Sequence, residues 1–182
     1  SDYTTGIGIL ISDTTGTVEV TDNTTNNNTD GIRIRNTDGA LVQGNTANNN
    51  QDKGIIIKFG DNADVLENTM TGNDIGLYLD GSKDGEIRRN TISNNTQDDI
   101  HLRDGSNNAV ITNNVIHNNG RAGLYAENAG GHAPVTNVTA TGNSFSGNGK
   151  NVINTTAQVV NASGNWWGVT AEAAVLASMT GN

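Results

Sequence analysis

Side chains that can bind carboxylates or move protons recur in this sequence at nearly even intervals. One series, Arg35, Lys58, Asp80 and Arg103, advances by 23, 22 and 23 residues, and a second, Tyr78, His101 and Tyr125, by 23 and 24. Arginine and lysine pair with carboxylates, and tyrosine and histidine act as general acids or bases. This spacing predicts that a repeating fold brings the residues together, so the repeat decides what they can do.

An asparagine-centred phrase repeats along the chain, for example EIRRNTISNN at residues 86–95. The first asparagines are Asn23, Asn45, Asn68, Asn90, Asn114, Asn143 and Asn165, at spacings of 22, 23, 22, 24, 29 and 22. In six copies a second asparagine follows five places later, at Asn28, Asn50, Asn73, Asn95, Asn119 and Asn148. A period of roughly 20 to 50 residues indicates a solenoid or another repeat array.

Apolar and polar residues alternate on both sides of each anchor asparagine, which predicts short strands with one buried face. A second kind of strand begins at a glycine, with buried pairs at Ile7/Ile9, Ile32/Ile34, Ile55/Ile57, Leu77/Leu79, Ile100/Leu102 and Leu124/Ala126. A third apolar position lies two residues after the anchor, as at Met70 and Ile92. Three short strands per repeat predict an all-β fold, a right-handed parallel β-helix of about seven coils.

Stacking of equivalent residues explains the asparagines. In such a helix each asparagine lies above its copy in the next coil, so its amide can hydrogen-bond to that copy and to turn backbone. We therefore expect the asparagine ladder to fix the register of the coils rather than to perform chemistry.

The whole chain, residues 1–182, is predicted to form one domain, with coils over about 6–168 and a capping helix and tail over 169–182. In that tail the expected N-cap is Thr170, and the apolar stripe of the helix is Val175, Leu176 and Met179. The helix is expected to fold over the last coil, with Trp166 or Trp167 helping to close it.

The other end of the predicted stack has no such cover. The chain enters its first coil within six residues, and an open strand edge is a template for further pairing. The sequence therefore predicts either upstream coils or a neighbouring subunit at this end.

Composition excludes several classes of partner. The net charge is −9 with a pI near 4.5, which disfavours nucleic acid and anionic membranes. Cysteine is absent, and no apolar run of about 18 residues suggests membrane insertion. The sequence also shows no retained signal peptide, so a secreted mature product or an excised fragment is expected.

The unit GLYL followed by NTISNN resembles the repeats of pectate-lyase-like β-helix proteins, of the carbohydrate-binding and sugar-hydrolase type. That group includes carbohydrate-binding modules, periplasmic copper-delivery accessory proteins and mannuronan C5-epimerases. GNWWG at residues 164–168 is similar to the terminal coil of bacterial cell-surface β-helix proteins. The epimerases imply an Asp-Pro-His-Glu cluster, whereas the only proline here, Pro134, has no acid beside it.

In enzymes of this group the outer face of the glycine-led strand binds acidic polysaccharide. The resemblance therefore implies a role for two outward columns, Gly8, Arg33, Ile56, Tyr78, His101, Tyr125 and Ile153, and Leu10, Arg35, Lys58, Asp80, Arg103, Glu127 and Thr155. The candidate glycan-binding residues are Arg33, Arg35, Lys58, Tyr78, Arg103 and Tyr125. As an enzyme, the protein would use Tyr78 and His101 for proton transfer and Asp80 to orient them. Alternatively, exposed strands carry such charge pairs for structure alone.

Three aspartates raise the question of calcium. Asp13, Asp38 and Asp61 each follow the first buried residue of a strand by six places, so we expect them to stack along one turn. Stacked carboxylates favour a cation such as calcium, although aspartate beside glycine is also ordinary turn chemistry. No other cofactor is expected.

The sequence favours an extracellular or cell-surface module with a structural or adhesive role, as a rigid stalk or fibre subunit that can bind acidic glycan. The alternative is a polyuronate-active enzyme, mannuronan C5-epimerase-like or a polysaccharide lyase, or a fragment of one. The balance leans towards a protein that is not an enzyme, because the turns are short and supply no walls for a deep site.

Overall fold

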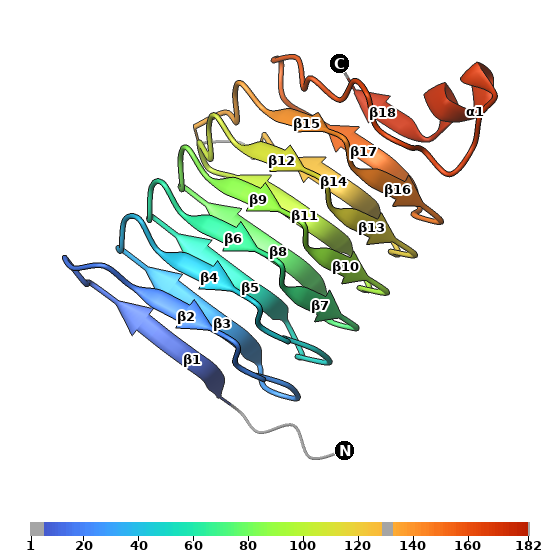
Figure 1. Cartoon of the computed structure of the whole chain (residues 1–182). Helices are drawn as coiled ribbons and strands as arrows, with labels where there is room; N and C mark the ends of the chain where they lie inside the picture. Colours follow the sequence, from blue (N-terminus) through green and yellow to red (C-terminus); the bar gives the residue numbers. More distant parts are fainter. Residues whose placement is uncertain (1–5, 129–132, 182) are drawn as a thin grey trace.

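Short strands wind into coils that stack along one axis (Figure 1). The computed structural model describes residues 6–128 and 133–181. Seven strands lie side by side, one from each coil, and a further strand from the tail extends their sheet. The predicted all-β parallel solenoid of about seven coils is confirmed.

Three parallel sheets form the walls of the solenoid. The first sheet contains, in spatial order, β1 (Ile7–Ser12), β3 (Asp30–Arg35), β5 (Lys53–Lys58), β8 (Ile75–Asp80), β11 (Asp98–Arg103), β14 (Ala122–Ala126), β17 (Lys150–Asn154) and β18 (Met179–Gly181). The second contains β2 (Glu19–Thr21), β4 (Leu41–Gln43), β6 (Asp64–Leu66), β9 (Glu86–Arg88), β12 (Val110–Thr112) and β15 (Thr139–Thr141). The third contains β7 (Thr69–Thr71), β10 (Thr91–Ser93), β13 (Val115–His117) and β16 (Ser144–Ser146).

The core is a set of apolar columns in which each residue packs on its copy in the next coil. Ile32, Ile55, Leu77, Ile100 and Leu124 are paired in register along the first sheet, and all are fully buried. Burial of such a side chain stabilises the fold by about 1.5 to 3 kcal/mol. The repeat therefore provides one continuous core from coils that could not be stable alone.

Each coil turns twice by the same device, a left-handed residue followed by a buried asparagine. The residues before the anchor asparagines all have φ between 55° and 69°, namely Asp22 (56°), Gly44 (68°), Glu67 (57°), Arg89 (55°), Asn113 (57°), Gly142 (68°) and Gly164 (69°). A left-handed residue reverses the strand sharply and leaves backbone groups inside the corner. The asparagine that follows supplies their hydrogen-bond partners.

The stacked asparagines bond to one another and to that backbone. Asn68 Nδ2 donates to Asn90 Oδ1 at 3.1 Å and to the carbonyl of Val42 at 2.8 Å, and Asn68 N donates to the same Asn90 oxygen at 2.9 Å. Asn45 makes the matching bonds to Asn68. The second asparagine of a coil, such as Asn50 or Asn73, packs against the glycine of the preceding strand of the first sheet. At Gly54 an added Cβ would lie 2.9 Å from Asn73 Nδ2 and 2.7 Å from a carbonyl, which explains the glycine there.

The first coil departs from the prediction by two residues. Ile9 pairs with Ile32 and Ile11 with Ile34, so the buried pair is Ile9/Ile11 rather than Ile7/Ile9. The segment GIGILIS offers alternating apolar residues in either register, and cross-strand pairing with β3 selects the later one. Residues 1–5 lie outside the described part of the chain.

The tail forms the expected short helix but uses it differently. In α1 (Glu172–Ala177) the N-cap is Ala171 without a side-chain cap, rather than Thr170, and the helix has no buried residue. Leu176 is 65% exposed, and α1 lies beside the last coil (Figure 1). Met179 instead reaches the core from β18, which pairs with β17. Among the described residues no helix is long and apolar enough to cross a membrane.

Candidate functional site

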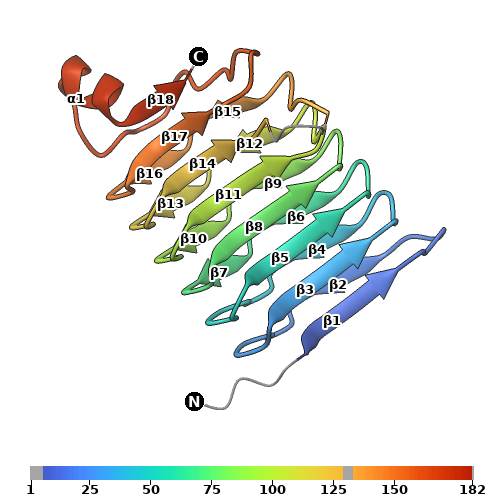
Figure 2. The same ribbon diagram turned by 180° about the vertical axis from the view of Figure 1, so that it is seen from behind.

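The outer face of the first sheet carries the two predicted columns. Figure 2 shows this sheet facing the viewer. From the second coil onward the columns are as expected, with Arg33, Ile56, Tyr78, His101 and Tyr125 in register. In the first coil Leu10 pairs with Arg33 and Ser12 with Arg35, so the places expected for Gly8 and Leu10 are wrong by the two-residue shift described above.

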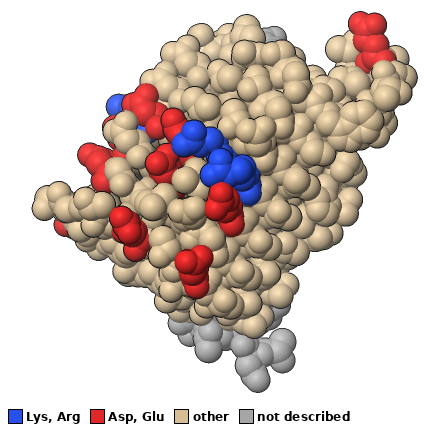
Figure 3. All heavy atoms as spheres, viewed as in Figure 1, with Lys and Arg blue, Asp and Glu red and all other residues tan. Residues whose placement is uncertain are grey.

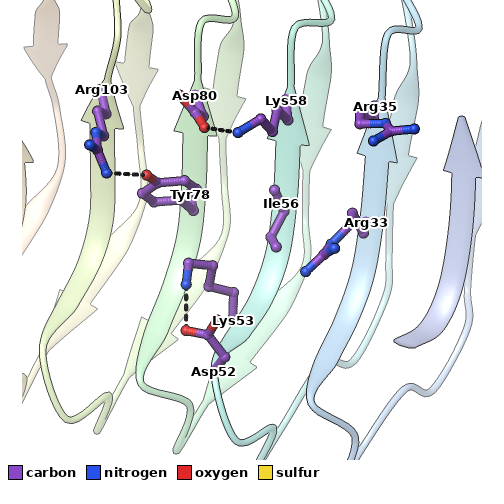
Figure 4. Close-up of a pocket in the computed structure, with 9 residues that line it drawn as sticks. All are labelled: Arg33, Arg35, Asp52, Lys53, Ile56, Lys58, Tyr78, Asp80 and Arg103. Carbon is purple, nitrogen blue, oxygen red and sulfur yellow. Dashed lines mark hydrogen bonds and ion pairs between the residues drawn. The ribbon is translucent and has the colours of Figure 1, made fainter. Parts of the chain in front are cut away.

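A shallow groove of about 380 Å³ crosses coils two to five on this face (Figure 4). It is lined by Arg33, Arg35, Asp52, Lys53, Ile56, Lys58, Tyr78, Asp80 and Arg103. Five of these residues are basic and two are acidic, so half of the chain's ten lysines and arginines line one depression. The lining residues themselves therefore carry three more positive than negative groups, in a protein whose net charge is −9.

Ion pairs hold all five cations of the groove, and each lies within ion-pair distance of an acidic side chain. Arg103 Nε lies 3.5 Å from Glu127 Oε2. Lys58 Nζ lies 2.6 Å from Asp80 Oδ2. Lys53 pairs with Asp52, and Arg33 with Asp30, which is buried beneath the groove and reduces the positive excess. Arg35 lies 3.6 Å from Asp13, and both side chains are half exposed, so this contact is weak.

Tyr78 lies at the centre of the groove with its hydroxyl held by Arg103. Arg103 Nη1 donates to Tyr78 Oη at 3.3 Å. Burial raises the pKa of Tyr78, and the hydrogen bond from Arg103 opposes that effect only in part. The hydroxyl is therefore protonated at neutral pH and can donate a hydrogen bond to a ligand in the groove.

A cluster of aromatic and acidic residues adjoins the groove at coils five and six. The His101 ring lies between Tyr78 and Tyr125, at centroid distances of 5.0 and 4.7 Å. Its Nε2 lies 2.9 Å from Glu127 Oε2, and its Nδ1 lies 3.3 Å from Asp98 Oδ2 in poor alignment for a hydrogen bond. Both imidazole nitrogens thus face carboxylates.

Asp98 is fully buried and held by Arg121. Arg121 Nε donates to Asp98 Oδ1 at 2.8 Å. Burial acts to raise the pKa of Asp98, but the adjacent His101 and the bonded Arg121 outweigh it, so the pKa lies below its ordinary value. The carboxylate therefore stays charged and anchors this end of the face.

The coil architecture agrees with a known family. Residues 7–166 match the family described as "Right handed beta helix region". The chain belongs to this right-handed β-helix family. Comparison with curated proteins finds no match.

Similar solved structures are enzymes of alginate metabolism. A double mutant of the periplasmic alginate epimerase AlgG has a TM-score of 0.73 at 18% identity, over 87% of this β-helix and 42% of that chain. A single mutant of AlgG has a TM-score of 0.70 at 18% identity, over 88% and 42%. The alginate lyase of Paenibacillus sp. str. FPU-7 has a TM-score of 0.57 at 15% identity, over 83% and 63%. These identities show a shared fold, and the β-helix spans under half of the epimerase and under two thirds of the lyase.

The β-helix brings most predicted site residues together. Arg33, Arg35, Lys58, Tyr78, Asp80 and Arg103 all line the groove. Tyr125 lies beyond it, beside His101, with Arg121 over its ring at 4.4 Å. The expected orientation of His101 by Asp80 differs from the observed contacts, because Asp80 is bound to Lys58 whereas His101 faces Glu127 and Asp98.

Sequence reasoning missed Lys53, Asp98 and Arg121. Each is at or just before the corner where a strand of the first sheet begins. Gly54 and Ile55 are both buried, so the alternation is interrupted there and Lys53 lies on the outer face. The position one place before the glycine, or before its equivalent, is occupied by the charged residues Asp30, Lys53 and Asp98 in three of the coils. Strict alternation assigns this position to the interior, so charged residues there were the available sign that it faces outward.

The aspartate stack expected for calcium is wrong at its first member. The shifted register places Asp13 on Asn36, whose Nδ2 donates to Asp13 Oδ1 at 2.7 Å. Asp38 and Asp61 do stack, and each accepts a backbone N–H from the next coil at 2.8 Å, from Asp61 and Lys83 respectively. Within 6–128 and 133–181, no three His, Cys, Asp or Glu side chains are grouped to hold a metal ion.

Proposed function

We propose that this β-helix binds acidic polysaccharide along the outer face of its first sheet, as a carbohydrate-binding module without catalysis. The observation that carries the proposal is the collection of five of ten basic residues in one groove of an acidic protein. Arginine and lysine at a groove pair with carboxylates, and arginine does so with two hydrogen bonds.

The repeat suits a linear polyanion. Coils stack about 4.8 Å apart, so a chain lying along the groove meets cations from the second, third and fifth coils. The ring of Tyr78 supplies an apolar surface between them. The similar structures are named for alginate, which is a polyuronate, and this supports a uronate ligand. Such polymers lie outside the cytoplasm, so we place the protein at the cell surface or in the extracellular space, with an adhesive or structural role.

Side-chain contacts favour binding over turnover. A base that removes a proton needs a nitrogen or carboxylate directed at the substrate. Both nitrogens of His101 face acids of the protein, and Asp80 is held by Lys58. The groove is also shallow, whereas catalytic sites exclude water.

One observation favours a second function, that of a polyuronate lyase or C5-epimerase. The Tyr78 hydroxyl is protonated, lies in the cationic groove and is positioned by Arg103. A tyrosine so placed could deliver a proton to a sugar ring. Ultraviolet absorbance of unsaturated ends, or proton exchange at C5, that is lost in Tyr78→Phe would favour this enzyme over the binding module.

The binding test compares two double variants that remove the same charge. Arg35→Gln with Lys58→Gln removes two cations of the groove, and Lys83→Gln with Arg89→Gln removes two exposed cations elsewhere. At about 1 kcal/mol per contact, the groove variant should bind alginate or polygalacturonate roughly tenfold or more weakly at low salt. Calorimetric titration measures the affinity, and added salt should weaken the native protein similarly. Equal loss in both variants, or no binding by the native protein, contradicts the proposal.

A further inference from the structure

The third sheet presents an outer face of different chemistry from the groove. Its strands, Thr69–Thr71, Thr91–Ser93, Val115–His117 and Ser144–Ser146, contain no lysine, arginine, aspartate or glutamate. Figure 3 shows a broad uncharged area over β7, β10, β13 and β16. The one titratable side chain on these strands is His117. They therefore offer a ligand no carboxylate, ammonium or guanidinium group, and an uncharged ligand that lies there removes no such group from water.

A tryptophan lies at the C-terminal end of this face. Trp166 is 53% exposed, although its backbone is fixed on both sides. Its N–H donates to Asn143 O at 2.8 Å, and its carbonyl accepts from Phe145 N at 2.7 Å. The neighbouring Trp167 points inward and stacks on Phe145 at 5.1 Å. Trp167 packs against the core, whereas Trp166 presents an exposed indole from a hydrogen-bonded backbone.

Beside this indole is a depression of about 360 Å³. Trp166 borders one side and Val115, which is 44% exposed, borders the other, with Ser144 between them. Gly142 and Gly164, both left-handed, leave the rim without side chains, and Asn113 adds an exposed amide. The depression thus combines two apolar surfaces with a hydroxyl and an amide, and it has no charged lining residue.

We propose that this depression is a second carbohydrate-binding site, specific for the uncharged pyranose ring of a neutral glycan. A pyranose has a C–H face that packs on an indole and equatorial hydroxyls that exchange hydrogen bonds with amides and serine. An acidic sugar would gain no ion pair here, which separates this site from the groove on the first sheet. The proposal stands on Trp166 and its surroundings, and it is independent of the function proposed above.

The test uses the full chain with Trp166 replaced in two ways. Trp166→Ala removes the aromatic surface, whereas Trp166→Phe keeps a flat ring, and Leu176→Ala removes an equally exposed apolar side chain elsewhere. Electrophoresis through gels containing neutral polysaccharides, namely glucomannan, xylan and hydroxyethylcellulose, identifies a ligand by retardation, and calorimetry with its oligosaccharides gives the affinity. We expect at least tenfold weaker binding for Trp166→Ala, partial retention for Trp166→Phe and native binding for Leu176→Ala.

The dependence of binding affinity on salt concentration distinguishes this site from the groove. Neutral-sugar binding should change little with ionic strength, and Trp166→Ala should bind alginate like the native protein. Absence of retardation by every neutral polysaccharide, or equal retardation of native protein and Trp166→Ala, overturns the proposal. Concentration-dependent dimerisation that is lost in Trp166→Ala, without sugar binding, would show that a second copy occupies this face and would equally overturn it.

Discussion

Asp99 occupies an interior position that is glycine in the coils on either side. By strand register it aligns with Gly76 and Gly123. Its carboxylate is fully buried and accepts hydrogen bonds from Asn95 Nδ2, at 2.5 Å, and from Asn119 Nδ2. Burial raises the pKa of Asp99 well above its ordinary value, although these amides act to lower it. The chain thus has a buried carboxyl group at a position that glycine occupies in the two adjacent coils.

Asp99→Gly should therefore stabilise the protein at neutral pH. Because its pKa is higher in the folded than in the unfolded state, Asp99 contributes stability that is fully present below the unfolded pKa of about 3.9 and is lost as pH rises through the folded pKa. Removing the carboxyl should increase the free energy of unfolding at pH 7 by about 1 to 3 kcal/mol, with Asn95 free to bond along its ladder.

Urea unfolding between about pH 4 and pH 8 measures this effect. The variant should lose less stability than the native protein as pH rises, and Asp64→Asn, on the outer face of the second sheet, should keep the native profile. A destabilised Asp99→Gly at pH 7 would show that the amides, rather than burial, decide the state of Asp99.

Single residues were predictable where the repeat is strict. Tyr78, Lys58 and Arg103 lie on strands of the first sheet whose buried pairs are unambiguous, so their outward columns could be assigned from spacing alone. Lys53 could not, because the corner at Gly54 interrupts the alternation, and the side-chain pairing of Asp80 with Lys58 depends on rotamers that no periodicity encodes.

At the scale of the element, the corner between two sheets is the repeated unit of stability. Asn68 illustrates it, because its side chain accepts a hydrogen bond from Asn45 and donates hydrogen bonds to Val42 and Asn90. Asn68→Ala removes these bonds and leaves buried groups of Asn45 and Val42 unpaired, at a cost of about 1 to 3 kcal/mol for each group. We expect a loss of roughly 3 kcal/mol in thermal or urea unfolding, whereas Gln51→Ala, at an exposed turn position, should change stability by less than about 0.5 kcal/mol. Similar losses for the two variants would refute a special role for the ladder.

Elements at the two ends were harder to predict than those in the middle. The pattern of residues 169–182 predicted that a short helix is present, but not its cap or what the helix packs against. The observed anchor is Met179 in β18, a three-residue strand too short to have a period of its own. At β1 two registers fit the apolar pattern equally, and only pairing with β3 distinguishes them.

At the scale of the whole molecule, each coil contacts its neighbours and little else. Removal of one full repeat should therefore leave a folded protein. Deletion of residues 45–67, from one anchor asparagine to the next, joins Gly44 to Asn68 and places Arg35 beside Asp80, which preserves a favourable pair. The shortened chain should keep its strand signal in circular dichroism and be shorter by about 4.8 Å in solution scattering. Deletion of residues 45–55, half a repeat, should unfold it, and tolerance of that deletion would contradict the stacked-coil account.

The same one-dimensional contact pattern governs how the molecule would respond to tension. Hydrogen bonds between coils run along the axis, so a force applied across one end separates the outermost coil while those behind it stay intact. Each detached repeat of 22 residues would lengthen the tether by roughly 70 to 80 Å. A β-helix pulled in this way would therefore lengthen in successive steps of one repeat each, rather than unfold all at once.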